Sequence, residues 1–409
     1  MTELFQAHTV REARELLAAH LGPDSGAEKV SLLDALGRRL AREVASVDQV
    51  PGFARSTVDG FAVRARDTFG ASESMPAYLD LAGEVLMGRE SVGQLAPGQA
   101  WLIPTGGMLP TGADAVVMVE HTEELDQRTV GVNSPVAPGD YVVRAGEDMM
   151  PGAILLPQGH LLRPQDLGLL SAAGVTEVFV FKRAKVGIIS SGDEVVAPTK
   201  QPGPGQLRDV NSYVLYGQAL AAGASPELLG IVGDQFESLL AVLRRALDVC
   251  DLVLISGGSS VGVRDVASEA LNTLGAPGVL FHGVSIKPGK PTVGAVVSGK
   301  PVFGLPGHPV SAAVVFELFV TPLLKHWGYP DHGPEFPVRA RLLRNMRSAA
   351  GREDFIRVKL AMDNGELTAE PILGKSGLIS TLVRADGLAY IPAEKEGIEA
   401  GEAIGVKLF

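Results

Sequence analysis

The most regular pattern of apolar and polar positions lies between residues 184 and 328. Short apolar runs there alternate with segments in which apolar residues recur at helical spacing. The runs predict strands over 186–190, 227–232, 252–256, 293–297 and 302–305, and the segments predict helices over 211–222, 237–247, 265–274 and, long and amphipathic, 309–326. Strands separated by such helices predict a mainly parallel sheet with both faces covered. Ligands of these sheets bind outside the carboxyl ends of the strands.

The rest of the chain has a different pattern of apolar and polar residues. Apolar residues at helical spacing predict two helices near the start, one through Val10, Ala13, Leu16 and Leu17 and one through Leu32, Leu33, Leu36 and Leu40. From about residue 45 to 143, short apolar stretches separated by Gly and Pro predict a small β-rich domain. Residues 151–181 predict a helix over 164–173 and a strand over 177–181. Short strands and turns from about 329 to 409 predict a second small β domain.

Composition narrows the class of protein. A chain of 409 residues is long enough for two to four domains. Its net charge of −11 argues against broad nucleic-acid binding, which needs a basic face. The single cysteine, Cys250, permits no internal disulfide, and we expect it to be buried and inert in a reducing cytoplasm. The first sixteen residues lack the apolar segment of a signal peptide, and no apolar run approaches the ~20 residues of a membrane span.

Three loops rich in Gly, Ser or Asp follow predicted strands of the parallel sheet, at residues 190–194, 256–262 and 304–309. Glycines let backbone N–H groups approach an anion, and a helix N-terminus adds favourable partial charge. One such loop alone is more often a turn or a helix entry, but three at one sheet edge favour an anion-binding site. The candidate substrate-binding residues in them are Ser190, Gly192, Ser256, Gly257, Gly258, Ser260, Pro306, Gly307 and His308.

Two lysines and several carboxylates complete the candidate site. Lys287 and Lys290 lie in a stretch stiffened by two prolines, which is either an exposed linker or, as we favour, the cationic part of an anion site. Carboxylates beside a phosphate pocket require a hard cation, for which Mg²⁺ is the default. Taken singly, each acid is more often a helix cap or a solvated turn residue, and Asp265 in particular could cap the helix that follows it. The acids are Asp59, Glu147, Asp148, Asp193, Glu194, Asp234 and Asp265.

The motifs of three common enzyme classes are absent from the sequence. It has no HExxH, no Walker A loop and no GxGxxG after a strand, so zinc proteases, P-loop NTPases and dinucleotide oxidoreductases receive little support. The eight histidines are scattered, and none is assigned as a metal ligand.

Together these stretches resemble the MoeA family of molybdopterin molybdenumtransferases, which includes the E domain of gephyrin. The resemblance covers essentially the whole chain in the right order. It rests on residues 51–62 (PGFARSTVDGFA), 104–120 (PTGGMLPTGADAVVMVE), 144–149, 190–194, 256–265, 286–291 and 304–311.

The resemblance implies a multidomain α/β fold with four domains. These are an elongated helical linker domain (1–44 with 142–181), a β-rich domain carrying Asp59 (45–141), a MogA-like α/β domain (182–328) and a C-terminal β domain (329–409). It also implies a homodimer, with the active site between the α/β domain of one subunit and the Asp59 domain of the other.

Individual roles follow from the same resemblance. Asp59, Glu194, Asp234 and Asp265 match the catalytic carboxylates, and Mg²⁺ is assigned to Asp59, Asp148, Glu194 and Asp265. Thr105, Lys287, Lys290, Ser376 and Ser380 join the substrate-binding residues. The implied reaction inserts molybdenum from molybdate into adenylylated molybdopterin and releases AMP, with a separate adenylyltransferase and recipient molybdoenzymes as partners.

Three departures from the family pattern stand out. Val58 replaces the usual Met before Asp59, His308 replaces Asn in GLPGNP, and Val358 replaces the Gly that follows DFxR. The histidine exchanges a small amide for a larger, titratable ring. It keeps open a diverged paralogue that handles tungstate or another nucleotide-linked ligand. A separate alternative, which does not depend on the histidine, is a scaffolding module of the gephyrin E type.

Overall fold

The computed structural model describes residues 7–23, 26–126, 128–257, 261–327 and 336–409, apart from the side chains of 261–265 and 326. The chain divides into two compact units, one formed by residues 1–26 with 182–409 and the other by residues 27–181. Each unit is described below by itself. No helix in the described part of the chain is long and apolar enough to cross a membrane.

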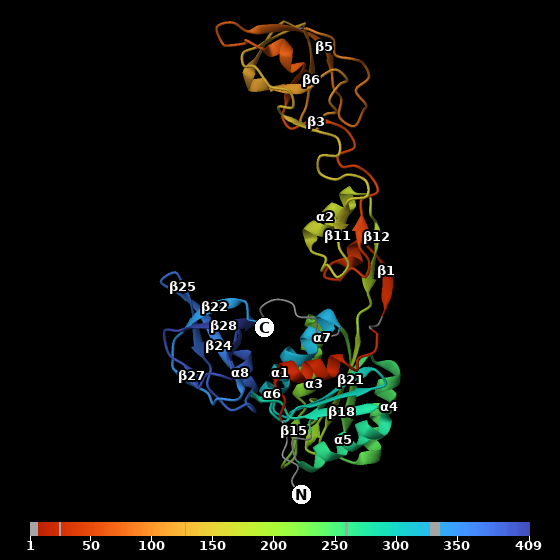
Figure 1. Ribbon diagram of the computed structural model, residues 1–409, viewed down its shortest axis with the longest axis vertical. Coiled ribbons are helices and arrows are strands. Elements are labelled where there is room, and N and C mark those ends of the chain that lie inside the picture. Colours follow the sequence, from red (N-terminus) through yellow and green to blue (C-terminus); the bar gives the residue numbers. More distant parts are fainter. Residues whose placement is uncertain (1–6, 24–25, 127, 258–260, 328–335) are drawn as a thin grey trace. The chain divides into compact units, whose positions relative to one another are not determined.

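The α/β part of the first unit is the region that includes β18 and β21 in Figure 1. It contains a six-stranded sheet in the order β16-β13-β17-β21-β20-β18. The first four strands are parallel, whereas β20 and β18 add an antiparallel edge, so the prediction of a mainly parallel sheet is confirmed. The strands are β13 (Lys185–Ser191), β16 (Ser225–Val232), β17 (Leu252–Gly257), β18 (Pro277–His282), β20 (Val293–Val297) and β21 (Lys300–Leu305). The sequence pattern did not predict β18, whose Pro277 and Gly278 are typical of turns and tolerated at an edge.

Helices cover both faces of this sheet. One face packs against α1 (Val10–Ala18), α3 (Asn211–Ala221) and α6 (Pro309–Val315), the other against α4 (Phe236–Val249) and α5 (Val261–Leu274). Helix α6 continues through a π-helical turn (Phe316–Val320) into α7 (Thr321–His326). The helix predicted over 309–326 is therefore present, but the prediction that it is amphipathic was wrong. Most of its described residues are buried because the C-terminal part of the chain packs on its outer side.

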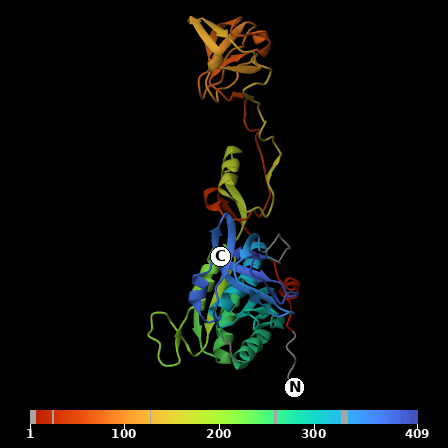
Figure 2. The same ribbon diagram turned by 90° about the vertical axis from the view of Figure 1, so that its left-hand side faces the viewer.

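The C-terminal part is a closed β-barrel. Strands β24, β25, β22, β28 and β26 pair in that order, and β26 pairs again with β24, so none of these five is a free edge. The strands are β22 (Val338–Leu342), β24 (Glu353–Asp363), β25 (Glu366–Pro371), β26 (Gly387–Ile391) and β28 (Ala403–Leu408). Figure 2 shows the barrel in blue against the α/β part, where Phe355 and Leu388 enter the same apolar core as α6. The predicted second β domain is confirmed.

The second unit contains a six-stranded sheet in the order β7-β4-β6-β5-β9-β8. The strands are β4 (Gly60–Val63), β5 (Ala77–Glu84), β6 (Gln99–Ile103), β7 (Ala115–Met118), β8 (Thr122–Asp126) and β9 (Thr129–Val132). Phe61, Val63, Val117 and Val130 form its buried core. Flanking this sheet, β3 (Arg55–Ser56) pairs with β10 (Val142–Val143). A small β-rich domain over these residues was the prediction from sequence.

Two distant chain segments build the remaining part of the second unit. Strand β1 (Ala27–Ser31) pairs with β12 (Glu177–Phe181), and β2 (Val44–Ala45) pairs with β11 (Ile154–Leu156), beside α2 (Pro164–Ala172). The helix predicted through Leu32–Leu40 was wrong. Only a 3₁₀ turn (Leu33–Ala35) forms, because Leu32 and Leu40 are buried against the second segment while Leu33 is exposed.

Helix α1, assigned from sequence to the linker domain, packs instead into the α/β core. Val10, Ala13 and Leu17 are buried there, and the Arg14 guanidinium donates to the Leu318 carbonyl. Residues 1–26 group accordingly with the first unit. The other domain boundaries remain predictions.

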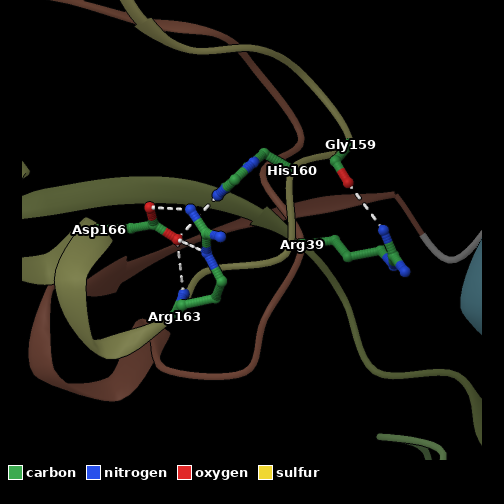
Figure 3. A network of polar contacts seen from close by, with 5 residues as sticks. All are labelled: Arg39, Gly159, His160, Arg163 and Asp166. Carbon is green, nitrogen blue, oxygen red and sulfur yellow. Dashed lines mark hydrogen bonds and ion pairs between the residues drawn. The ribbon is translucent and has the colours of Figure 1, made fainter.

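A buried carboxylate fixes the start of α2 (Figure 3). Asp166 accepts hydrogen bonds from the Arg163 side chain at 3.0 Å and from the Arg163 backbone N–H at 2.8 Å, and it contacts His160 Nε2 at 2.8 Å. Nearby, Arg39 donates to the Gly159 carbonyl at 2.8 Å. The bonds from Arg163, followed by the contact with His160, hold the pKa of Asp166 well below its usual range.

We expect Asp166→Asn to lower the free energy of unfolding by about 1–3 kcal/mol, since charge-assisted bonds to a buried group are lost. Because the folded-state pKa is depressed, the wild-type contribution is complete above about pH 4 and is lost as the pH falls towards that pKa. Urea unfolding at several pH values measures this, with the exposed Asp48→Asn as the matched control. Equal stability of the two variants at neutral pH would contradict the assignment.

Candidate functional site

Three of the predicted loops start at one edge of the parallel sheet. Strands β13, β17 and β21 are neighbours, with Ser190 beside Ser256 and Ser256 beside Leu305 in register. The residues that follow these positions therefore emerge side by side, as the alternation of strands and helices predicted.

A layer of buried polar side chains lies beneath this edge. Asp209 accepts hydrogen bonds from the hydroxyls of Ser190 at 2.7 Å and Ser212 at 2.6 Å. Asn211 Nδ2 donates to Ser256 Oγ at 2.8 Å and to the Gly307 carbonyl at 2.9 Å. These bonds connect all three loops to the start of α3, and sequence reasoning missed Asp209 and Asn211. The available signal was Asp-Val-Asn-Ser across the start of a predicted helix, a pattern typical of side chains that bond the first helical turn.

Gly257 is required by the close approach of two loops. A Cβ atom there would lie 1.8 Å from the Ser191 carbonyl oxygen, and the residue has a φ of 132°. Only glycine fits without displacing backbone. The same crowding holds β17 and β13 together where both strands end.

Carboxylates gather at the end of β13. The Glu194 carboxylate lies over Gly192, where a Cβ would meet Glu194 Oε2 at 2.5 Å. Ser191 Oγ donates to Asp234 Oδ1 at 3.1 Å, and Asp234 N–H donates to Asp193 Oδ1 at 3.3 Å. Glu194 and Asp234, two of the four predicted catalytic acids, therefore belong to the same sheet edge.

A cavity of about 880 Å³ adjoins this edge, between the α/β part and the barrel. It is lined by Lys287 and Lys290 from one loop, by Pro306, Gly307 and His308 from another, and by Ser376 from the barrel part. Strand β19 (Ile286–Lys287) pairs with β24, placing Lys287 beside Asp354 in register. Six of the predicted substrate-binding residues thus line one cavity.

The described lining of the cavity is strongly cationic. Only one acid, Asp354, lies among these residues, and Arg352 Nε already donates to it at 2.8 Å. The cations are Lys287, Lys290, Arg347, Arg352, Arg357 and Lys375. In a chain with a net charge of −11, such a concentration of positive charge indicates an anion-binding site.

Arg357 is the least compensated of these cations. Its Nη2 donates to the Gly374 carbonyl at 2.9 Å, but Nε and Nη1 are buried without a hydrogen-bond partner. Burial lowers the pKa of Arg357, which means that the charged form lacks stabilising contacts. The candidate residues chosen from sequence did not include Arg357, although it lies in the Asp-Phe-Ile-Arg stretch.

The second unit carries Asp59 and Thr105. Asp59 Oδ1 accepts hydrogen bonds from Thr105 N at 2.7 Å and from Thr105 Oγ1 at 2.9 Å. The backbone bond and then the hydroxyl bond lower the pKa of Asp59, whose carboxylate is exposed. Asp148 lies in an exposed turn, where its backbone N–H donates to the Val50 carbonyl at 3.1 Å, and among the described residues no hydrogen bond joins it to Asp59.

The structure does not place the remaining predicted site residues at the sheet edge or in the cavity lining. Gly258, Ser260 and the side chain of Asp265 fall outside the described residues. Ser380 lies in α8 (Ile379–Val383), where its carbonyl accepts from Arg384, and it does not line the described cavity.

Comparisons with known proteins cover nearly the whole chain. Residues 8–174 match the family described as "MoeA N-terminal region (domain I and II)", residues 187–326 a "Probable molybdopterin binding domain" and residues 339–409 the "MoeA C-terminal region (domain IV)". A molybdopterin molybdenumtransferase of Bacillus subtilis is 34% identical over 95% of this chain and 91% of its own length. A putative molybdopterin biosynthesis protein of Methanocaldococcus jannaschii is 37% identical over 96% and 95%.

Solved structures agree with the sequence comparison. Two structures of a molybdopterin biosynthesis MoeA protein from Pyrococcus horikoshii align with TM-scores of 0.82 and 0.86. The first is 38% identical and covers 98% of this chain and 99% of its own; the second is 33% identical and covers 99% and 100%. With the matched regions in order, the identity above 30% and the fold shared over the full length, the chain belongs to the MoeA family, whose curated relatives include molybdopterin molybdenumtransferases.

Proposed function

We propose that this chain is a molybdopterin molybdenumtransferase that inserts molybdenum from molybdate into adenylylated molybdopterin and releases AMP. The observation that carries the proposal is the cationic cavity beside the glycine-rich sheet edge. Molybdate is a tetrahedral dianion, and the adenylylated substrate carries a pyrophosphate. Both are ligands that lysine, arginine and backbone N–H groups recognise.

Each part of the first unit has a role in this proposal. The loops after β13, β17 and β21 bind the nucleotide-linked pterin, with Ser190, Ser256 and Gly257 at their starts. Lys287, Lys290 and Arg357 attract molybdate into the cavity. Holding the oxyanion next to the dithiolene sulfurs lowers the barrier chiefly through proximity, and positive charge stabilises the departing AMP phosphate.

The acids suit a magnesium ion that takes most of its ligands from substrate. Among the described residues no three acidic, cysteine or histidine side chains lie close enough to form a metal site on their own. Mg²⁺ typically takes one or two carboxylates plus phosphate oxygens. Glu194, folded over Gly192 at the sheet edge, is the acid best placed to hold it, and Asp59 from the second unit is the other candidate. When bound, Mg²⁺ would neutralise charge on the pyrophosphate.

The proposal includes a homodimer in which Asp59 of one subunit serves the cavity of its partner. A separate adenylyltransferase supplies the substrate, and recipient molybdoenzymes take the product. Support for these points comes from the family resemblance. A scaffolding role of the gephyrin E type is the second candidate, but it does not require the uncompensated Arg357 in the cavity.

The test is release of AMP from adenylylated molybdopterin in the presence of Mg²⁺, with and without molybdate. We expect release that depends on molybdate, and a product that activates a cofactor-free molybdoenzyme. Tight binding of the substrate without AMP release would refute the enzyme and favour a binding module. Tungstate in place of molybdate, and in competition with it, tests the diverged paralogue.

A further inference from the structure

One nitrogen atom joins the loop after β21 to the loop after β17. Asn211 Nδ2, at the start of α3, donates to the Gly307 carbonyl at 2.9 Å and to Ser256 Oγ at 2.8 Å. A carbonyl oxygen can only accept, so Gly307 fixes which end of the Asn211 amide faces the loops. The residue is buried, with 9% of its surface exposed.

The other end of the same amide has no partner. Asn211 Oδ1 is buried, and no described residue donates a hydrogen bond to it. A buried acceptor without a hydrogen bond destabilises the folded state, and such groups are rare in native proteins. The amide keeps this orientation although it leaves Oδ1 unbonded, which indicates that the two bonds from Nδ2 matter for more than stability.

The bond to the Gly307 carbonyl sets the direction of the peptide group between Gly307 and His308. That peptide is trans, so its C=O and N–H point in opposite directions. With the carbonyl turned towards the buried Asn211, the His308 N–H points away from it. Gly307 and His308 line the cavity, whereas Asn211 does not. Among the described residues, none accepts a hydrogen bond from the His308 N–H.

The local sequence does not impose this direction. Gly307 has no Cβ atom, so rotation of the peptide that follows it meets little steric resistance. Turned the other way, the peptide would present its carbonyl oxygen to the cationic cavity, and that oxygen would repel an oxyanion. An anchor outside the loop therefore decides whether this peptide attracts or repels an anion.

We propose that Asn211 is a positioning residue for oxyanion binding. It holds the peptide between Gly307 and His308 so that the His308 N–H donates to molybdate in the cavity. Asn211 itself contacts no ligand, and its bond to Ser256 ties this donor to the neighbouring loop at the sheet edge. The inference rests on the proposed function, because it concerns molybdate in the same cavity.

Amide hydrogen exchange of the wild-type chain, measured by mass spectrometry with and without saturating molybdate, tests the direction of the peptide. Pro306 and Pro309 carry no amide hydrogen, so Gly307 and His308 supply the exchangeable amides between Leu305 and Val310. We expect molybdate to slow exchange in this segment about tenfold, the effect of one additional hydrogen bond. Unchanged exchange at saturating molybdate would overturn the inference without any variant.

Two uncharged variants, Asn211→Leu and Asn211→Ala, remove the bonds from Nδ2. The first keeps a branched side chain and the second leaves space, so an effect common to both comes from the lost donor. Isothermal titration should show molybdate affinity lowered about tenfold or more, the loss expected for one hydrogen bond to a charged group. The slowing of exchange by molybdate at Gly307 and His308 should also disappear.

Gln218→Met is the matched control. Gln218 Nε2 also lies in α3 and donates to a backbone carbonyl of α6, that of Ala313, at 3.1 Å, but the residue does not line the cavity. This variant should bind molybdate with the wild-type affinity and show the wild-type slowing of exchange.

The possible failures are distinguishable. If both Asn211 variants keep the wild-type affinity and slowed exchange, or if Gln218→Met loses as much affinity as they do, the inference is wrong and the proposed function stands. Absence of molybdate binding by the wild type would overturn both. Thermal unfolding shows whether each variant is folded, and if neither Asn211 variant folds, the wild-type exchange experiment decides the inference alone.

Discussion

Asp59→Asn should abolish most of the turnover while leaving the fold intact. We expect molybdate-dependent AMP release to fall about 100-fold or more, the usual loss when one charged group of a catalytic site is removed. The Thr105 amide and hydroxyl hold the Asp59 carboxylate in place and lower its pKa. Asparagine can still accept from Thr105 through its amide oxygen, so the loop keeps its anchor and only the charge is lost.

Single-turnover AMP release and calorimetric unfolding together measure this effect. Asp80→Asn is the matched control, since it removes an exposed carboxylate from β5 of the same sheet. Near-normal turnover of Asp59→Asn would remove Asp59 from the mechanism. A large fall in unfolding temperature would instead assign it a structural role at the Thr105 turn.

The helices and strands of the α/β part were predictable because the patterns that indicate them, apolar runs for strands and helical spacing for helices, are local in the sequence. Strands such as β20 are continuous apolar runs, buried along their whole length, and helices such as α4 have apolar residues at helical spacing. Once strands and helices alternate, the parallel order brings their carboxyl ends to one edge. The convergence of the loops at Ser190, Ser256 and Leu305 followed from that order alone.

What was missed depends on contacts between distant segments. The pattern from Leu32 to Leu40 fits a helix, but those leucines are buried by residues more than a hundred positions later. The buried character of the helix after Pro309 likewise depends on the barrel, whose Phe355 and Leu388 cover it. Periodicity records which faces are apolar and carries no information about what lies on the other side.

The same limit explains which site residues sequence reasoning overlooked. Lys287 and Lys290 are conspicuous because they stand close together in a proline-rich stretch. Asn211 acts through hydrogen bonds to Ser256 and Gly307, which lie 45 or more positions later in the chain. Arg357 acts through a hydrogen bond to Gly374, which lies 17 positions later. An isolated arginine in a strand has many ordinary explanations, and only burial without partners distinguishes Arg357 from them.

Arg357→Met should weaken molybdate binding more than loss of any exposed cation of the cavity. Two of its guanidinium nitrogens are buried without partners, so its charge is only partly compensated by the Gly374 carbonyl. A dianion in the adjoining cavity would supply the missing negative charge in a region of low dielectric. We expect a loss of about 30-fold or more in affinity, the equivalent of a hydrogen-bonded charge pair at roughly 2 kcal/mol.

Arg347→Met is the matched control, because Arg347 lines the same cavity but is exposed, and solvent screens its charge. It should cost only a few-fold in the same isothermal titration. Arg357→Lys should lie between wild type and Arg357→Met, since it keeps the charge and loses the planar fork. Equal losses for Arg347→Met and Arg357→Met would mean that molybdate responds to the summed charge of the cavity, and that the buried, uncompensated position of Arg357 contributes nothing of its own.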